Sequence, residues 1–159
     1  MIFSTSLRKL LVVILASAAL SACATASKKS GKISGDVYSG SDTIEYLATG
    51  VADRVFFATN KSTLTTAARD TLRKQAAWMR KKSKLTFTIE GHADERGTRE
   101  YNLALGERRA NAAKDYLMTY GISGKRISVI SYGKERPANT ASTPLAWSQN
   151  RRSVTVKVN

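Results

Sequence analysis

A negative charge just before a predicted helix and a positive charge on one face of that helix could together bind a ligand. Asp94 lies in the loop where a predicted strand ends and this helix begins, a position where side chains and backbone N–H groups are open to ligands. Asn102, Leu105 and Arg109 are spaced i, i+3 and i+7, so they share one helix face. Arg108 is turned away from that face by about 100°. A carboxylate can pair with an ammonium and a guanidinium can grip a carboxylate through two parallel hydrogen bonds, so the spacing predicts a pocket for a small zwitterion.

Simpler structural roles could explain the same residues. Asp94 and Arg109 could form an internal ion pair, and surface pairs of that kind contribute little to stability. The segment Asn150-Arg151-Arg152 precedes the last predicted strand, and we expect one arginine to fix a loop near the site and the other to be exposed. Trp78 and Trp147 are expected to be packing residues rather than platforms for sugar rings.

Catalysis is the competing function class. His92, Asp94, Glu95 and Glu100 lie close together in the sequence and could form a metal site or an acid–base pair. However, His92 is the only histidine of the chain, and no His-Glu-x-x-His spacing occurs. No pattern indicates two carboxylates set across a cleft, as glycan cleavage requires. The sequence therefore favours a binding protein over an enzyme, with no metal ion and no cofactor.

Cys23 is the only cysteine, and it stands where a secretory signal would be cut. Arg8 and Lys9 give the positively charged N-terminal region of a signal peptide, and residues 10–20, which follow it, are almost wholly apolar. This run is shorter than the roughly 20 apolar residues that a transmembrane helix needs. We therefore expect residues 1–22 to be a signal peptide and Cys23 to accept a covalent lipid. The alternative is a plain secretory signal that leaves Cys23 as a free thiol.

The four residues Leu20-Ser21-Ala22-Cys23 resemble the lipobox of bacterial lipoproteins. In enteric lipoproteins an Asp after the cysteine is associated with retention at the inner membrane, whereas this chain has Ala24. The resemblance therefore implies a lipid anchor in the outer membrane, with the rest of the chain on the periplasmic face.

The charge of the chain favours anionic partners. Lys and Arg number 26 against 12 Asp and Glu, which gives a formal net charge of +14. Membrane headgroups, wall polymers and nucleic acid would all be attracted. An exported chain without strips of alternating aromatic and basic residues makes nucleic acid the weakest of these candidates, and we expect no nucleic-acid partner.

Periodicity divides the chain into a tether and one domain. Residues 23–50 are expected to form the lipidated N-terminus and a flexible tether, because this stretch is rich in Ser, Gly, Thr and Lys. Within it, residues 43–47 could form a short helix or pack against the domain. Residues 51–159 form the domain. Alternating and helical patterns predict, in order, a strand at 51–57, a helix at 65–82, a strand at 85–90, a helix at 101–120, and strands at 127–132 and 154–158. This β-α-β-α-β-β order predicts an α+β sandwich, a mixed sheet with both helices on one face.

Four separated motifs carry a resemblance to a known family. They are Gly91-His92-Ala93-Asp94-Glu95-Arg96-Gly97, the helix segment from Tyr101 to Ala110, Ser131-Tyr132-Gly133, and Asn150-Arg151-Arg152. Together they resemble the OmpA-like peptidoglycan-binding domain over residues 51–158. Their order and number make the resemblance specific, where a single Gly-His-x-Asp would not be.

The resemblance implies a ligand and a set of contacts. The ligand of the family is the meso-diaminopimelate of the peptidoglycan stem peptide, whose free end is a zwitterion. Asp94 and Arg109 are then the ligand contacts, and Asn102 and Leu105 shape the pocket. The binding set is completed by four further residues: His92, Ala93, Thr59 and Asn60. Many relatives have Asp where this chain has Asn60 and an aromatic residue where it has Thr59.

Two cellular roles fit this resemblance. The residues of the first two motifs are similar to those of lipoproteins that work with TolB and other Tol proteins in envelope integrity and cell division. In that role, binding of the wall and binding of TolB compete. The alternative is a stand-alone wall-anchoring lipoprotein with the same domain and no Tol partner.

Overall fold

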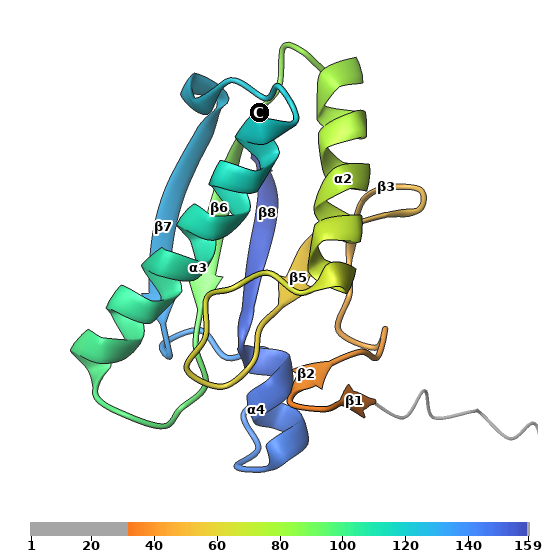
Figure 1. Cartoon of the computed structure of the whole chain (residues 1–159). Coiled ribbons are helices and arrows are strands. Elements are labelled where there is room, and N and C mark those ends of the chain that lie inside the picture. The colour runs from red at the N-terminus through yellow and green to blue at the C-terminus, as the bar shows by residue number, and fades with distance from the viewer. Residues whose placement is uncertain (1–31, 159) are drawn as a thin grey trace, which may run out of the picture.

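A four-stranded sheet lies at the centre of the structure (Figure 1). The structure is a computed structural model that describes residues 32–158, so the predicted signal peptide and Cys23 lie outside the described residues. The strand order is β5-β8-β6-β7. The strands are β5 (Arg54–Phe56), β6 (Thr86–His92), β7 (Ile127–Gly133) and β8 (Arg152–Val158). β8 pairs antiparallel with both β5 and β6, whereas β6 and β7 are parallel.

Two long helices cover one face of this sheet (Figure 1). They are α2 (Thr66–Lys81) and α3 (Arg99–Thr119), close to the predicted ranges. Each begins after a threonine, Thr65 or Thr98, whose hydroxyl accepts a hydrogen bond from the third backbone N–H of the helix. The core between helices and sheet includes Phe57, Leu72, Met79, Phe87, Ile89, Ala110, Ala113 and Leu117. The predicted α+β fold, with a mixed sheet and its two main helices on one face, is confirmed.

The segment between the last two predicted strands, where the sequence predicted neither helix nor strand, contains a helix, α4 (Pro144–Asn150). Thr143 caps it through its hydroxyl, and Pro144 stands in the first turn, where its missing N–H is not needed. A short 3-10 turn, η1 (Gly124–Arg126), precedes β7. The sequence prediction omitted α4 because a helix of seven residues shows too little periodicity.

The expectation that the chain is a flexible tether up to residue 50 is wrong for residues 32–50. β1 (Ile33–Ser34) pairs with β2 (Val37–Tyr38), and β3 (Tyr46–Ala48) pairs with β4 (Val51–Ala52). The first hairpin is fixed by Tyr38, which is 3% exposed and packs edge-on against Phe56 with 4.7 Å between ring centroids. Strands of two or three residues are too short to be recognised by alternation, so the sequence pattern could not predict these hairpins.

The topology brings three chain segments together at one end of the sheet. β8 runs antiparallel to β5 and β6, so it begins at the end where those two strands finish. Asp94 follows β6, Thr59 follows β5, and Arg151 immediately precedes β8. In Figure 1 this is the lower end of the sheet, beside α4 and the β1–β2 hairpin.

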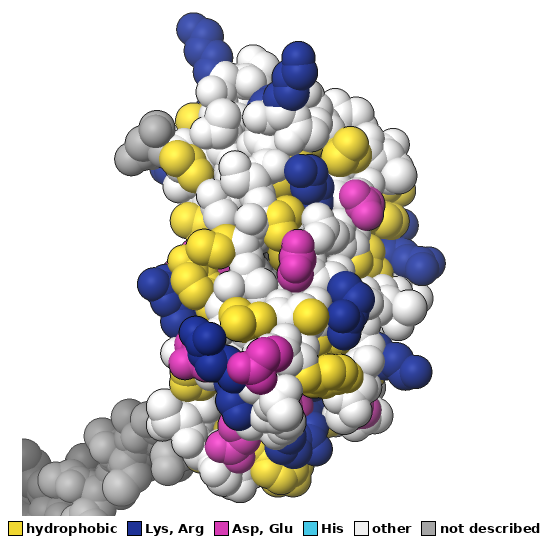
Figure 2. All heavy atoms as spheres, turned by 90° about the vertical axis from the view of Figure 1, so that its left-hand side faces the viewer, with side chains coloured by type: hydrophobic (Ala, Val, Ile, Leu, Met, Phe, Trp, Pro, Cys, Tyr) yellow, Lys and Arg dark blue, Asp and Glu magenta, His cyan; other side chains and the backbone are white. Residues whose placement is uncertain are grey.

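Charged side chains are spread over the face that carries β7 and α3. Figure 2 shows Lys and Arg at many separate places on this face, with Asp and Glu between them. On this side, the excess of positive charge is therefore not gathered into one basic patch. No helix among residues 32–158 has both the length and the apolar character needed to cross a membrane.

Candidate functional site

A carboxylate held by two arginines marks the end of β6. Asp94 is 7% exposed, and its Oδ2 accepts hydrogen bonds from Arg96 Nη2 at 2.7 Å and from Arg151 Nη1 at 3.2 Å. Its Oδ1 accepts from the backbone N–H and the Nε of Arg96, both at 3.1 Å. Burial raises the pKa of Asp94, but the hydrogen bonds from Arg96 and Arg151 outweigh it, and the pKa lies below the usual range. Asp94 is therefore ionised at neutral pH.

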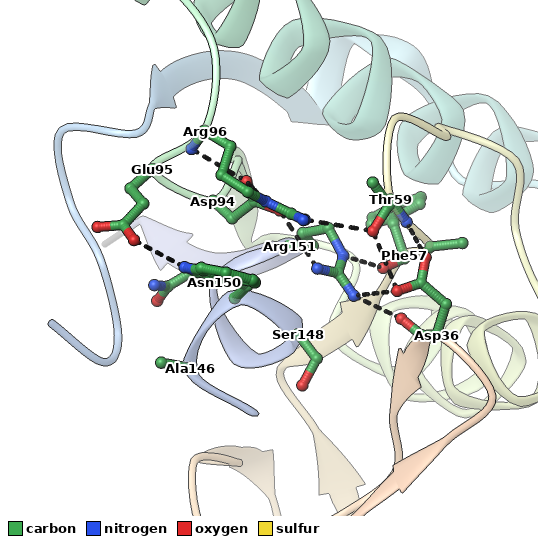
Figure 3. Close-up of polar contacts among 12 residues, drawn as sticks. Asp36, Phe57, Thr59, Asp94, Glu95, Arg96, Ala146, Ser148, Asn150 and Arg151 are labelled. Atoms are coloured by element: carbon green, nitrogen blue, oxygen red, sulfur yellow. Dashed lines mark hydrogen bonds and ion pairs between the residues drawn. The ribbon is translucent and has the colours of Figure 1, made fainter. Parts of the chain in front are cut away.

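Arg151 connects Asp94 to two other segments. Its Nε donates to the carbonyl of Phe57 at 3.1 Å, which fixes the chain after β5. Its Nη2 donates to the Asp36 carboxylate at 2.9 Å and also to the Asp36 carbonyl. Figure 3 shows the Arg151 guanidinium between Asp94 and Asp36. Arg151 itself is only 2% exposed, so its contacts with Asp94 and with the Phe57 carbonyl are shielded from water, whereas the Asp36 side chain is 53% exposed.

Arg109 lies beneath the same site and does not pair directly with Asp94. Its side chain is fully buried and donates to three backbone carbonyls, those of Lys61 (2.9 Å), His92 (2.8 Å) and Ala58 (3.0 Å). Burial lowers its pKa to about 10, so the guanidinium still carries its charge at neutral pH. A guanidinium has five N–H donors, so two remain for another acceptor. The internal Asp94–Arg109 ion pair considered above is not formed in this structure.

The predicted helix face supports the site from behind. Asn102 is 2% exposed, and its side-chain amide donates to the carbonyl of Arg96 at 2.9 Å. Leu105 is 3% exposed and Arg108 is exposed, as their spacing relative to Arg109 predicts. The face therefore positions the loop around Asp94, because the side-chain amide of Asn102 holds the backbone of that loop at Arg96.

The loop after β5 presents a backbone N–H to the site. Asn60 has a φ of 56°, the left-handed conformation that Asn adopts more readily than most residues. Its side chain is exposed. The preceding Thr59 donates its N–H, and its hydroxyl at 3.0 Å, to the Asp36 carboxylate. Arg96 Nη2 also donates to this hydroxyl at 3.3 Å.

The side chains of His92 and Ala93 are almost completely buried, at 1% and 3% exposed. The His92 ring lies against Tyr132, with 5.6 Å between ring centroids, and its Nε2 is 3.5 Å from the Glu90 carboxylate. Both residues contribute to the site through their backbone. The His92 carbonyl accepts from Arg109, and the Ala93 N–H donates to the carbonyl of Gly133 at 2.7 Å.

The expectation of one exposed arginine in Asn150-Arg151-Arg152 is wrong, because both are buried. Arg152 is 7% exposed and donates to the carbonyls of Asn150 at 3.4 Å and Arg136 at 3.1 Å. The two arginines are neighbours where the chain enters β8, and side chains alternate between the faces of a strand. Arg151 thus belongs to the site and Arg152 to a separate network.

Trp147 contacts two residues of the loop around Asp94, so it is not merely a packing residue. Its Nε1 donates to Glu95 Oε1 at 2.7 Å, and the Arg96 guanidinium lies 4.3 Å from its ring centroid. The hydrogen bonds from Trp147 and Ser142 lower the pKa of Glu95. Trp78, by contrast, packs against Phe87 at 5.8 Å between ring centroids, as predicted.

Sequence reasoning missed two charged members of the site, Asp36 and Arg96. Arg96 stands inside the motif segment, so its position next to Asp94 was a usable signal. Asp36 lies 115 residues from Arg151 in a segment expected to be flexible, and no local pattern connects the two. Within residues 32–158, no group of three or more His, Cys, Asp or Glu side chains could hold a metal ion.

Comparison with known proteins places these residues in a family context. Residues 56–151 match the model of the OmpA family. The chain is 55% identical over 106 residues to the peptidoglycan-associated lipoprotein of Rhizobium meliloti, a match that spans 67% of this chain but only 60% of that protein. The crystal structure of the peptidoglycan-associated lipoprotein from Burkholderia pseudomallei is 32% identical, with a TM-score of 0.65 over 67% of this chain and 90% of the other. The C-terminal domain of Helicobacter pylori MotB is 17% identical with a TM-score of 0.63, which shows a shared fold alone.

Proposed function

This chain belongs to the OmpA family, and from that premise we propose that it binds peptidoglycan noncovalently through the stem peptide. Its likeness to peptidoglycan-associated lipoproteins supports the wall as the partner. The observation that carries the proposal is the meeting of Asp94 with Arg96, Arg109 and Arg151 at one end of the sheet. Opposite charges held a few ångströms apart suit a ligand that is itself a zwitterion.

The free end of meso-diaminopimelate supplies both complementary charges. Its ammonium would pair with the ionised Asp94 carboxylate, taking the place of part of the Arg96 contact. Its carboxylate would bind the guanidinium groups of Arg151 and Arg109, together with the Thr59 N–H. Arg96 is the more exposed partner of Asp94, since 42% of its side chain is accessible against 3% for Arg151. Arg96 is therefore the residue that moves aside most easily.

The test is co-sedimentation with purified peptidoglycan for the parent and for Asp94→Asn. Asparagine keeps the shape of the side chain but removes the charge that holds the ammonium, so we expect wall binding to weaken by about tenfold or more. Free stem peptide should release the parent from the wall. Asp115→Asn serves as the control, because it removes one carboxylate from an exposed position on α3. Equal sedimentation of parent and Asp94→Asn would exclude this pocket.

Asp94→Asn is a cleaner test than truncation of Arg109. Removing the Arg109 side chain would leave the carbonyls of Ala58, Lys61 and His92 without their donor. A buried polar group without a partner costs about 1–3 kcal/mol. An Arg109→Ala protein could therefore lose wall binding simply because it unfolds, and its unfolding curve must be measured beside its binding.

The wider role follows from the same likeness. A lipid on Cys23 would anchor the protein in the outer membrane on the periplasmic face, and the site would connect that membrane to the wall. Membership of the Tol-Pal system, with TolB competing for the surface around the site, is supported by the likeness to peptidoglycan-associated lipoproteins. Purified TolB should then displace the protein from peptidoglycan. If TolB neither binds nor competes, the stand-alone wall-anchoring role holds instead.

A further inference from the structure

Asp36 reaches into the site from the turn between β1 and β2. Its carboxylate accepts hydrogen bonds from the Thr59 N–H, from the Thr59 hydroxyl at 3.0 Å and from Arg151 Nη2 at 2.9 Å. Burial raises its pKa, but the Thr59 hydrogen bonds and the charges of Arg151 and Arg96 outweigh it and hold the pKa below the usual range. An exposed carboxylate of the N-terminal segment is thus held by three donors of the folded domain (Figure 3).

These three donors together can bind a carboxylate. A backbone N–H, a hydroxyl and a guanidinium converge on one point, and charge-assisted hydrogen bonds of this kind are stronger than neutral ones. Under the proposed function, the ligand presents a carboxylate to the same Thr59 N–H and the same Arg151 guanidinium. Two carboxylates cannot occupy these donors together, because their negative charges would repel each other at hydrogen-bond distance.

We propose that Asp36 is a built-in competitor that occupies the carboxylate position of the binding site until peptidoglycan displaces it. The proposal rests on the proposed function, because it assigns Asp36 to the position of the ligand carboxylate. Binding then exchanges one carboxylate for another and releases the β1–β2 turn from the domain.

The turn is built so that it can leave while the rest of the hairpin stays. β1 and β2 have two residues each, and the Asp36 side chain is 53% exposed, so the contact can be replaced by water at moderate cost. Gly35 precedes Asp36 with a φ of 62°, a conformation that glycine adopts without strain, and an added Cβ there would meet no atom within 4 Å. Tyr38, buried against Phe56, holds the hairpin in place from the other side.

The contact also links the site to the membrane anchor. Asp36 lies 13 positions after Cys23, on the segment that connects the predicted lipid to the domain. Displacement of Asp36 would therefore loosen the β1–β2 turn, which lies on this connecting segment.

The experiment compares Asp36→Asn with the parent, both as full-length protein in detergent. The probe is a synthetic stem tripeptide ending in meso-diaminopimelate, and its affinity is measured by calorimetry. Removing the competing charge should tighten binding about threefold to thirtyfold, the range expected for one partly exposed charge-assisted contact. Asp42→Asn is the matched control: Asp42 lies in the same N-terminal segment but accepts from Gln149 at 3.1 Å.

Unchanged or weaker binding by Asp36→Asn would overturn the competitor role, and weaker binding would make Asp36 part of the ligand site. Absence of binding by the parent and by every variant would instead overturn the proposed function itself. A second measurement follows the amide resonances of Gly35, Asp36 and Thr59 during titration of the parent. The turn resonances should shift together with that of Thr59, and a turn that does not respond while Thr59 does would also contradict displacement.

Discussion

At the scale of single residues, Arg109 and Arg151 have different functions although both are buried. Arg109 donates to carbonyls of the loop after β5 and to that of His92 at the end of β6, and it thereby shapes the floor of the site. Arg151 contacts two carboxylates, Asp94 and Asp36, and so connects the charges that a ligand would meet. Helix spacing predicted that Arg109 faces inward, because i and i+7 positions share a face. It could not predict that Arg151 would contact Asp94, because that contact depends on where β8 begins beside β6.

His92 gives the protein a pH dependence that can be measured. Burial lowers the pKa of His92 from 6.5 to about 3, and the nearby charges of Arg152 and Arg54 add to the effect. Between these two values the unfolded chain binds a proton that the folded chain does not. The contribution of His92 is therefore fully present above pH 6.5 and is lost as the pH falls toward 3, by up to about 1.4 kcal/mol per pH unit.

Replacing His92 with Asn removes this titration. The free energy of unfolding should then fall less steeply between pH 6 and pH 4.5 than it does in the parent, as measured by urea denaturation at a series of pH values. If the free energy of unfolding falls equally steeply with pH in parent and variant over this range, His92 is not buried in its neutral form. Below this range the carboxylates of Asp94 and Glu95 titrate in both proteins, so only the upper range isolates the histidine.

At the scale of elements, the site depends on how closely α3 approaches β6. Gly91 of β6 and Gly106 of α3 lie in direct contact, and an added Cβ on Gly91 would overlap the carbonyl of Gly106. This close packing sets the depth at which Arg109, one turn further along α3, enters the site. The periodicity of the sequence predicted both elements, but it did not assign either glycine to the contact.

Gly91→Ala should therefore push α3 away from the sheet and destabilise the protein by about 1–3 kcal/mol, as overpacking does. Thermal unfolding followed by circular dichroism would show the loss. Gly124→Ala is the control, because its added Cβ would meet mainly the flexible end of Met118, at 3.2 Å. If the two alanine variants unfold at the same temperature, the Gly91–Gly106 contact does not limit the packing of α3.

The elements that the sequence failed to predict are short and depend on tertiary contacts. The α4 helix carries readable signals in Thr143 and Pro144, yet its seven residues offer only two turns of pattern. The β1–β2 hairpin is held on the domain by Tyr38 packing against Phe56, and its turn contacts Arg151 through Asp36; both contacts join residues that are distant in sequence. The long helices and the seven-residue strands were predictable because their patterns repeat several times within one element.

At the scale of the whole molecule, residues 32–50 are part of the fold, although the sequence predicted a tether there. A tether of about 27 residues could stretch to about 90 Å, whereas residues 23–31 alone can span only about 30 Å. Release of the hairpins at 33–52 would restore the longer reach. With the proposed lipid on Cys23, the docking of residues 32–50 on the domain would set how far the candidate site can lie from the membrane.

Cys23→Ser separates the two ends of this proposed link. Without the thiol no lipid can be attached, so the protein should move from the membrane fraction to the soluble periplasmic fraction when cells are fractionated. Its binding to purified peptidoglycan should stay within about twofold of the parent, because Asp94, Arg109 and Arg151 lie in the folded domain and do not involve the anchor. Ala24→Ser is the control, since it changes the neighbouring residue and keeps the cysteine. A Cys23→Ser protein that still fractionates with membranes would show a second anchor, and one that loses wall binding would show that the lipid contributes to the site.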